Sequence, residues 1–216
     1  MLNKTVVLSW VLFLSFQVQA AQEPKVKITE DLAEVTVKHN GQSVTIKRNQ
    51  DQQNRIDEDF ALTSRACPPF CLQPMDLLPG VKTIGELEML DFLKRKAAGD
   101  DSILIIDSRT PDWVAKGTIP SAINIPWTKL FPQASSFETL EVEGILTLQF
   151  GASVVDTIWD FSHAKTLVMF CNGPWCGQSP TNIKALVSMG YPADKIFWYR
   201  GGMQAWHAAG LTTVSP

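Results

Sequence analysis

The stretch "TLVMFCNGPWCGQSP", residues 166–180, joins an apolar run to a loop that carries two cysteines and two glycines. A continuous apolar run is typical of a strand that is buried on both faces of a parallel sheet. Cys171 comes directly after it, at the carboxyl end of the strand, where ligands bind in open α/β sheets. The helical pattern "TNIKALVSMG" follows at 181–190. The stretch therefore predicts a strand, a site loop and a helix.

Cys171 is the candidate nucleophile of this loop. We expect Ser179 to be the N-cap and Pro180 the first residue of the following helix, whose positive end then faces the loop. Gly173 and Gly177 permit a turn whose backbone N–H groups can bind an anion. Both features lower the pKa of a thiol. The alternative is that Cys171 is simply buried as a small hydrophobic residue.

The rest of the chain predicts an α/β domain. Thr83 and Glu86 have the spacing of a capping box that opens a helix with Leu87, Leu90 and Leu93 on one face. Further helices are expected within 140–150 and over 180–189. The expected strands are "SILIID" (102–107), "AINI" (122–125), "TLVMF" (166–170) and "KIFWY" (195–199). Because strands alternate with helices, we predict a mostly parallel sheet flanked by helices.

A separate pattern precedes this domain. Apolar and polar residues alternate over residues 25–48 around Asn40-Gly41, which predicts a small β-hairpin. We expect three parts: a signal peptide at 1–20, an extension with the hairpin and a cysteine-containing loop at 21–80, and the α/β domain at 81–216.

The first residues, "MLNKTVVLSWVLFLSFQVQA", combine one lysine, a short apolar run and a small-residue end. This pattern predicts a secretory signal that is cleaved after Ala20, and therefore a periplasmic or otherwise exported protein without stable membrane insertion after cleavage. The apolar run is shorter than the roughly 20 residues that span a bilayer. An uncleaved membrane anchor is the alternative.

Composition narrows the function classes. The chain has 216 residues, 45% of them hydrophobic, and a formal net charge of −3. A mildly acidic chain without a basic block gives no support to nucleic-acid binding. The three histidines have no metal-ligand spacing, so we expect neither a metal site nor a cofactor.

Residues from about 85 to 211 resemble the rhodanese-like domain family. The resemblance rests on "ILIIDSRTPDWVAKGTIPSAINIPW", on "LVMFCNGPWCGQS" and on "GYPADKIFWYRGGMQAW". It implies the rhodanese-like fold and a sulfurtransferase in which Cys171 carries sulfane sulfur as a persulfide. It also implies that Asp107 and Arg109 are structural residues that brace the loops.

The chain departs from the family pattern in three places. Thr118 and Ser121 stand where the family usually has His and Gly. Ser179 lies two residues further from the cysteine than in the common loop, which here contains no Arg or Lys. This argues against thiosulfate as the favoured donor. The phosphatase relatives place an arginine at the position of Gly177, so the sequence argues against a phosphatase as well.

We expect Cys171 and Cys176 to be catalytic, with Cys176 either a resolving cysteine or an inert wall of the loop. Trp175 either shapes an apolar entrance or covers the core. The expected substrate-binding residues are Asn172, Gly173, Trp175, Gly177, Gln178 and Ser179. The expected partners are a small sulfur-containing donor and a thiol acceptor, which is a small molecule or a protein. The alternatives are a thiol–disulfide redox protein that uses Cys171 and Cys176, and a non-catalytic binding module.

The motif Cys-Pro-Pro-Phe-Cys, residues 67–71, lies outside the family resemblance. In an exported protein, Cys67 and Cys71 are most simply joined in a small disulfide loop. The alternatives are a redox partner pair and a metal or cofactor site. If the motif lies beside Cys171, a thiol relay between the two cysteine pairs becomes testable.

Overall fold

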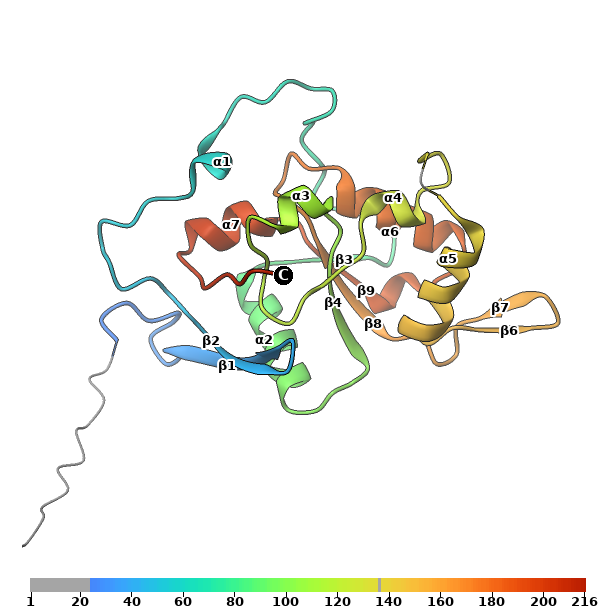
Figure 1. The fold of residues 1–216 in the computed structure, drawn as a ribbon, viewed down its shortest axis with the longest axis horizontal. Helices are drawn as coiled ribbons and strands as arrows, with labels where there is room; N and C mark the ends of the chain where they lie inside the picture. The colour runs from blue at the N-terminus through green and yellow to red at the C-terminus, as the bar shows by residue number, and fades with distance from the viewer. Residues whose placement is uncertain (1–23, 136) are drawn as a thin grey trace, which may run out of the picture.

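The computed structural model describes residues 24–135 and 137–216. The predicted signal segment lies outside the described residues. A five-stranded parallel sheet in the order β3-β9-β8-β4-β5 forms the centre of the fold (Figure 1). Its strands are β3 (Lys82–Ile84), β4 (Ile103–Asp107), β5 (Ile123–Asn124), β8 (Thr166–Phe170) and β9 (Ile196–Tyr199). The predicted α/β fold with a mostly parallel sheet is confirmed.

Helices cover both faces of this sheet (Figure 1). On one face lie α2 (Glu86–Ala97) and α7 (Gly202–Ala208). On the other lie α4 (Trp127–Leu130), α5 (Thr139–Gly144) with the π-helical turn Ile145–Gln149, and α6 (Gln178–Ser188). The short helix α3 (Pro111–Val114) follows β4, and the 3-10 turn Ala193–Lys195 precedes β9.

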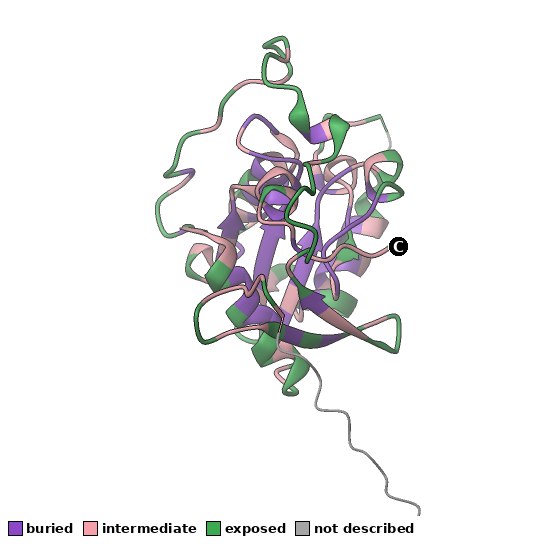
Figure 2. Ribbon diagram, turned by 90° about the vertical axis from the view of Figure 1, so that its left-hand side faces the viewer, coloured by how far each residue is buried: buried purple, intermediate pink, exposed green. Residues whose placement is uncertain are grey.

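Strand β8 is buried on both faces, as the apolar run 166–170 predicted. Leu167 and Met169 point into the core under α4–α6, whereas Val168 and Phe170 point into the core under α2 and α7. All four are fully buried, because successive side chains of a strand point to opposite faces and both faces of this sheet are covered. The buried strands lie at the centre of Figure 2.

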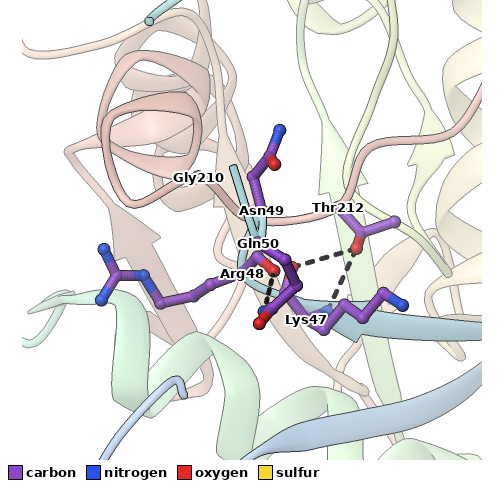
Figure 3. Close-up of a pocket in the computed structure, with 6 residues that line it drawn as sticks. All are labelled: Lys47, Arg48, Asn49, Gln50, Gly210 and Thr212. Carbon is purple, nitrogen blue, oxygen red and sulfur yellow. Dashed lines mark hydrogen bonds between the residues drawn. The ribbon is translucent and has the colours of Figure 1, made fainter. Parts of the chain in front are cut away.

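The predicted hairpin is present as β1 (Glu34–His39) and β2 (Gln42–Lys47), which pair antiparallel across Asn40 and Gly41. It packs Val35, Val37 and Ile46 into the core beneath α2. The chain beyond β2 runs along the residues after α7, where the Asn49 N–H donates to the Gly210 carbonyl (2.7 Å). Figure 3 shows the hollow of about 350 Å³ at this seam.

Between β2 and β3 the chain makes a long excursion over the carboxyl edge of the sheet, with α1 (Glu58–Ala61) as its helix (Figure 1). The described residues 62–81 form neither helix nor strand. We call residues 65–75, which contain both cysteines of the Cys-Pro-Pro-Phe-Cys motif, the cover segment.

Several local predictions were wrong. The capping box belongs to Gly85 and Glu88, whose carboxylate accepts from the Gly85 N–H, because Thr83 is part of β3. Leu87 is exposed, and Met89 and Phe92 join Leu90 and Leu93 on the buried face of α2. The sequence analysis also missed the hairpin of β6 (Ser153–Val155) and β7 (Ile158–Asp160), whose short strands are partly exposed and lack a clear apolar alternation.

Candidate functional site

Cys171 lies at the carboxyl end of the central strand β8, which is flanked by β4 and β9. The loop 171–177 then turns back into α6. Both thiols are free and buried, with 2% of Cys171 and 4% of Cys176 exposed. The rigid sheet therefore fixes one end of the loop and the packed helix α6 the other.

Ser179 holds the sulfur of Cys171. Its hydroxyl donates to Cys171 Sγ (3.1 Å) and accepts from Trp198 Nε1 (3.1 Å), which lies on the neighbouring strand β9. The prediction that Ser179 is the N-cap of α6 was wrong. Gly177 occupies that position, since its carbonyl accepts from the Thr181 N–H, and Ser179 lies within the first turn with its hydroxyl turned toward the sulfur.

Opposing effects act on the pKa of Cys171. Burial raises the pKa, but the Cys176 thiol, the Ser179 hydroxyl and the backbone N–H groups of Ser179 and Gly173 donate to the sulfur and together lower it below the usual value. Donors that surround a sulfur stabilise its thiolate. The thiol form also has a partner, because Cys171 Sγ lies 3.4 Å from the Cys176 carbonyl oxygen.

Cys176 has the opposite character. Burial, followed by the hydrogen bond to Cys171 and the negative charge of that thiolate, raises the pKa of Cys176 well above its usual value. When the pair holds a single proton, that proton therefore resides on Cys176. Loss of a proton from this pair yields a thiolate at Cys171 and a neutral thiol beside it.

The start of α7 closes the loop from the side. The N–H groups of Met203 and Gln204 donate to the carbonyls of Cys171 (2.9 Å) and Asn172 (2.8 Å). This close approach needs Gly202, whose φ is +54° and where a Cβ atom would lie 2.3 Å from the Cys171 carbonyl oxygen. The Gln204 side chain accepts from Trp175 Nε1 (2.9 Å).

A pocket of about 440 Å³ opens in front of the loop. Its walls combine Cys176 with four aromatic side chains: Phe70, Trp113, Trp127 and Trp175. None of the described residues that line it carries a charged side chain. Cys176 lines this pocket, whereas Cys171 lies behind it.

The predicted substrate-binding residues fall into two groups. Asn172, Trp175, Gly177 and Gln178 line the pocket. Gly173 and Ser179 do not line it, and instead donate to the Cys171 sulfur. Trp175, for which two roles were open, forms part of the pocket wall and is also largely buried.

The cover segment contributes residues that sequence reasoning did not assign to the site. Phe70 packs edge-on against Trp175, with ring centroids 5.6 Å apart, and contacts the cluster of Cys171, Trp175 and Cys176. The Arg65 guanidinium lies 4.6 Å from the Trp175 ring centroid. The Gln73 N–H donates to the Pro174 carbonyl (2.8 Å). These contacts join residues about one hundred positions apart, so no local pattern could have indicated them.

A disulfide joins Cys67 and Cys71 within this segment. Arg200 holds the segment in place, because its guanidinium donates to the carbonyls of Gln73 and Pro74.

Asp107 and Arg109 form a fully buried ion pair, with Arg109 Nη2 2.6 Å from Asp107 Oδ2. Thr118 donates to the same carboxylate (2.7 Å), and Arg109 also donates to the Trp113 and Gly117 carbonyls. These contacts tie α3 and its following turn to the end of β4. The geometry fits a bracing role next to the pocket wall at Trp113.

Among the described residues, no group of three or more His, Cys, Asp or Glu side chains is placed to hold a metal ion. Within residues 24–135 and 137–216, no helix is long and apolar enough to cross a membrane.

The model of the rhodanese-like domain family matches residues 90–209. The chain belongs to the rhodanese-like domain family. No curated protein matches it at a significant level.

Solved structures of similar fold include three with named activities. SseA from Escherichia coli, a 3-mercaptopyruvate sulfotransferase, is 23% identical over 56% of this chain and 40% of its own, with a TM-score of 0.37. A human single-domain sulfurtransferase is 20% identical over 57% of this chain and 93% of its own (TM-score 0.34). The As/Sb reductase of Leishmania major is 20% identical over 58% of this chain and 77% of its own (TM-score 0.40).

Proposed function

We propose that this rhodanese-like protein is a sulfurtransferase that carries sulfane sulfur as a persulfide on Cys171. The observation that carries the proposal is the hydrogen bond from the Ser179 hydroxyl to Cys171 Sγ (3.1 Å), at the carboxyl end of the central strand. The Cys176 thiol and the N–H groups of Gly173 and Ser179 also lower the pKa of Cys171. Donors that favour a thiolate make Cys171 both a nucleophile and a good leaving group, as sulfur transfer requires. An inert buried cysteine needs no such arrangement.

The reaction is a double displacement at sulfur. The Cys171 thiolate attacks the sulfane sulfur of a donor, a new S–S bond forms, and the remainder of the donor leaves with the bonding electron pair. An acceptor thiolate then attacks the outer sulfur of the persulfide. Cys171 leaves as a thiolate, for which its lowered pKa makes it a good leaving group.

The pocket favours small organic sulfur compounds as donors and thiols as acceptors. Its aromatic wall of Phe70, Trp113, Trp127 and Trp175 contacts apolar groups well, and the described lining residues offer no cation for a doubly charged anion such as thiosulfate. Arg65 stands nearby, but its guanidinium lies over the Trp175 ring.

Cys176 supports a second candidate function, thiol–disulfide redox chemistry on the same loop. Cys176 lines the pocket and hydrogen-bonds to Cys171. A Cys176 thiolate can attack the inner sulfur of a Cys171 persulfide, which releases hydrosulfide and leaves a Cys171–Cys176 disulfide.

We place this activity in an exported compartment. Two observations support the placement: the secretory pattern of residues 1–20 and the disulfide between Cys67 and Cys71, a bond that persists in oxidising environments.

The test is intact-mass analysis of reduced protein after exposure to an organic persulfide, to polysulfide and to thiosulfate. We expect an adduct of one sulfur atom that disappears in Cys171→Ser and persists in Cys176→Ser. The organic persulfide should load the protein more than thiosulfate does. If no donor yields an adduct in the wild type or in Cys176→Ser, the sulfurtransferase proposal fails.

A redox titration separates the second candidate. A reversible Cys171–Cys176 disulfide in a protein that never loads sulfur would identify a thiol–disulfide redox protein. If the chain shows neither sulfur loading nor this disulfide, and Cys171→Ser keeps the phenotype of the wild type, the loop is a binding module.

A further inference from the structure

The segment that carries the Cys67–Cys71 disulfide and the loop that carries Cys171 and Cys176 both contribute residues to one pocket. Pro69 and Phe70, which lie between Cys67 and Cys71, form one wall, and Cys176 lies in another. Phe70 also contacts the cluster formed by the two loop cysteines and Trp175. The backbone hydrogen bond from Gln73 to Pro174 fixes the chain two residues beyond Cys71 against the loop. The cover segment therefore holds its disulfide beside the loop that carries the other pair.

The two pairs differ in oxidation state and in access to solvent. Cys67 is exposed, Cys71 is half-buried, and the two are joined in a disulfide. Cys171 and Cys176 are buried and free. A reductant in solution can therefore reach the outer pair, Cys67 and Cys71, more easily than the inner pair, Cys171 and Cys176.

We propose that the outer pair, Cys67 and Cys71, is a second redox centre that returns an oxidised Cys171–Cys176 pair to its dithiol by exchange across the pocket. The oxidised inner pair arises when Cys176 displaces hydrosulfide from a Cys171 persulfide. Any other oxidant of the two thiols yields the same disulfide, so the exchange does not depend on the proposed sulfur transfer.

The geometry sets the order of the two steps. Cys176 lines the pocket and Cys171 lies behind it, so the reduced Cys71, as a thiolate, attacks the Cys176 sulfur. A Cys71–Cys176 bond forms and Cys171 leaves as a thiolate. The Cys67 thiolate then attacks Cys71, the outer disulfide forms, and Cys176 leaves and takes up a proton. Two electrons have moved from the outer pair to the inner pair, and the second proton of the outer dithiol goes to solvent.

The surroundings of Cys171 favour this direction. Its sulfur receives hydrogen bonds that stabilise the thiolate, and stabilising the reduced form makes the corresponding disulfide a stronger oxidant. The structure has the distribution of bonds expected after the exchange, with the outer disulfide formed and the inner thiols free. A dithiol reductant in solution then reduces Cys67–Cys71 and completes the cycle.

The first experiment traps the mixed disulfide. In Cys67→Ser/Cys171→Ser, only Cys71 and Cys176 remain, and oxidised glutathione should yield an intramolecular Cys71–Cys176 bond that peptide mapping identifies. Cys71→Ser/Cys171→Ser is the matched control, because it leaves exposed Cys67 with Cys176. We expect about tenfold more internal bond in the first variant, the equivalent of about 30 mV. Equal yields, or two glutathione adducts without an internal bond, would overturn the exchange.

The second experiment uses the wild type, so it does not depend on how the variants fold. The protein is equilibrated in glutathione buffers and quenched with acid. Peptide mapping then identifies the remaining disulfide in molecules in which one of the two cysteine pairs is reduced. Protein with a Cys67–Cys71 disulfide and free Cys171 and Cys176 should be about tenfold or more abundant than protein with a Cys171–Cys176 disulfide and free Cys67 and Cys71. The opposite order would overturn the proposed direction. Sulfur loading of Cys171 in Cys67→Ser/Cys71→Ser tests the sulfurtransferase separately, since loading does not need the outer pair.

Discussion

The outer and the inner cysteine pair have similar spacing, four and five residues, but opposite surroundings. Cys67 and Cys71 lie in a cover segment without helix or strand among its described residues. Cys171 ends the central strand of the sheet, and Cys176 lies in the loop between that strand and the packed helix α6. In the outer pair, the covalent bond itself constrains the chain. In the inner pair, the fold supplies the constraint, which leaves both thiols free for chemistry.

The difference shows that spacing between cysteines does not decide their chemistry. Cys171 receives a hydrogen bond from Ser179, whose own hydroxyl is held by Trp198. The pKa of its partner Cys176 is raised, because burial and the neighbouring charge disfavour a second thiolate. A hydrogen bond from α6, oriented by a residue of β9, therefore distinguishes the sulfur of Cys171 from that of Cys176. The difference between the bonded outer pair and the free inner pair should therefore depend on the fold, on the outer disulfide and on single hydrogen bonds.

The largest effect is expected at the closure of the inner loop. Gly202→Ala should lower the free energy of unfolding by about 3 kcal/mol, because the new Cβ meets the Cys171 carbonyl oxygen and the backbone has a positive φ. Gly41→Ala is the matched control: φ is +79°, but no atom lies within 4 Å, so only the backbone strain of about 1 kcal/mol remains. Urea denaturation measures both. Equal losses would mean that the loop tolerates a shift of α7.

A smaller loss is expected from the outer pair. The loop closed by Cys67 and Cys71 is short, so replacing both residues by alanine should cost about 2 kcal/mol. A reducing agent should produce the same loss in the wild type and no loss in the double variant. If reduction destabilised the double variant as well, the inner pair would also have been bonded in solution.

Much of this contrast could be predicted from the sequence, and the remainder depends on distant contacts. The run 166–170 indicates a doubly buried strand, and from it follow the sheet, the place of Cys171 and the helix after the loop. The role of Ser179 could not be read in the same way, because its hydroxyl is oriented by Trp198 on another strand. The approach of Phe70 to Trp175 likewise joins segments that share no local period.

The next effect concerns the ionisation of the inner pair. Ser179→Ala removes one donor to the Cys171 sulfur, which raises the pKa of that thiol and moves its alkylation profile to higher pH. Only the thiolate reacts, so at pH values below the pKa of the wild-type thiol the rate should fall by about tenfold, since a hydrogen bond to a charged group contributes about 1.5 kcal/mol or more. Mass mapping after brief exposure to a small alkylating reagent measures the rate at each cysteine.

Ser188→Ala is the control for this prediction, because Ser188 lies in the same helix and donates to the Ala185 carbonyl, away from the thiols. Its profile should match that of the wild type. In both proteins Cys171 should react at a lower pH than Cys176, whose pKa is raised. If Cys176 were alkylated faster than Cys171 at neutral pH, access through the pocket rather than thiolate character would decide the reactivity of the two cysteines.

The smallest effect is expected where the cover segment meets the loop. Arg65 lies over the Trp175 ring, and a partly exposed contact of this kind contributes about 1 kcal/mol. Arg65→Gln should therefore increase local opening of the segment by about fivefold, which hydrogen exchange at the Gln73 amide measures, since that N–H is bonded to the Pro174 carbonyl. Arg95→Gln, which removes a guanidinium from the Phe92 ring on α2, should leave this amide unchanged. Equal exchange in all three proteins would mean that Phe70 and Arg200 suffice to hold the outer disulfide beside the inner thiols.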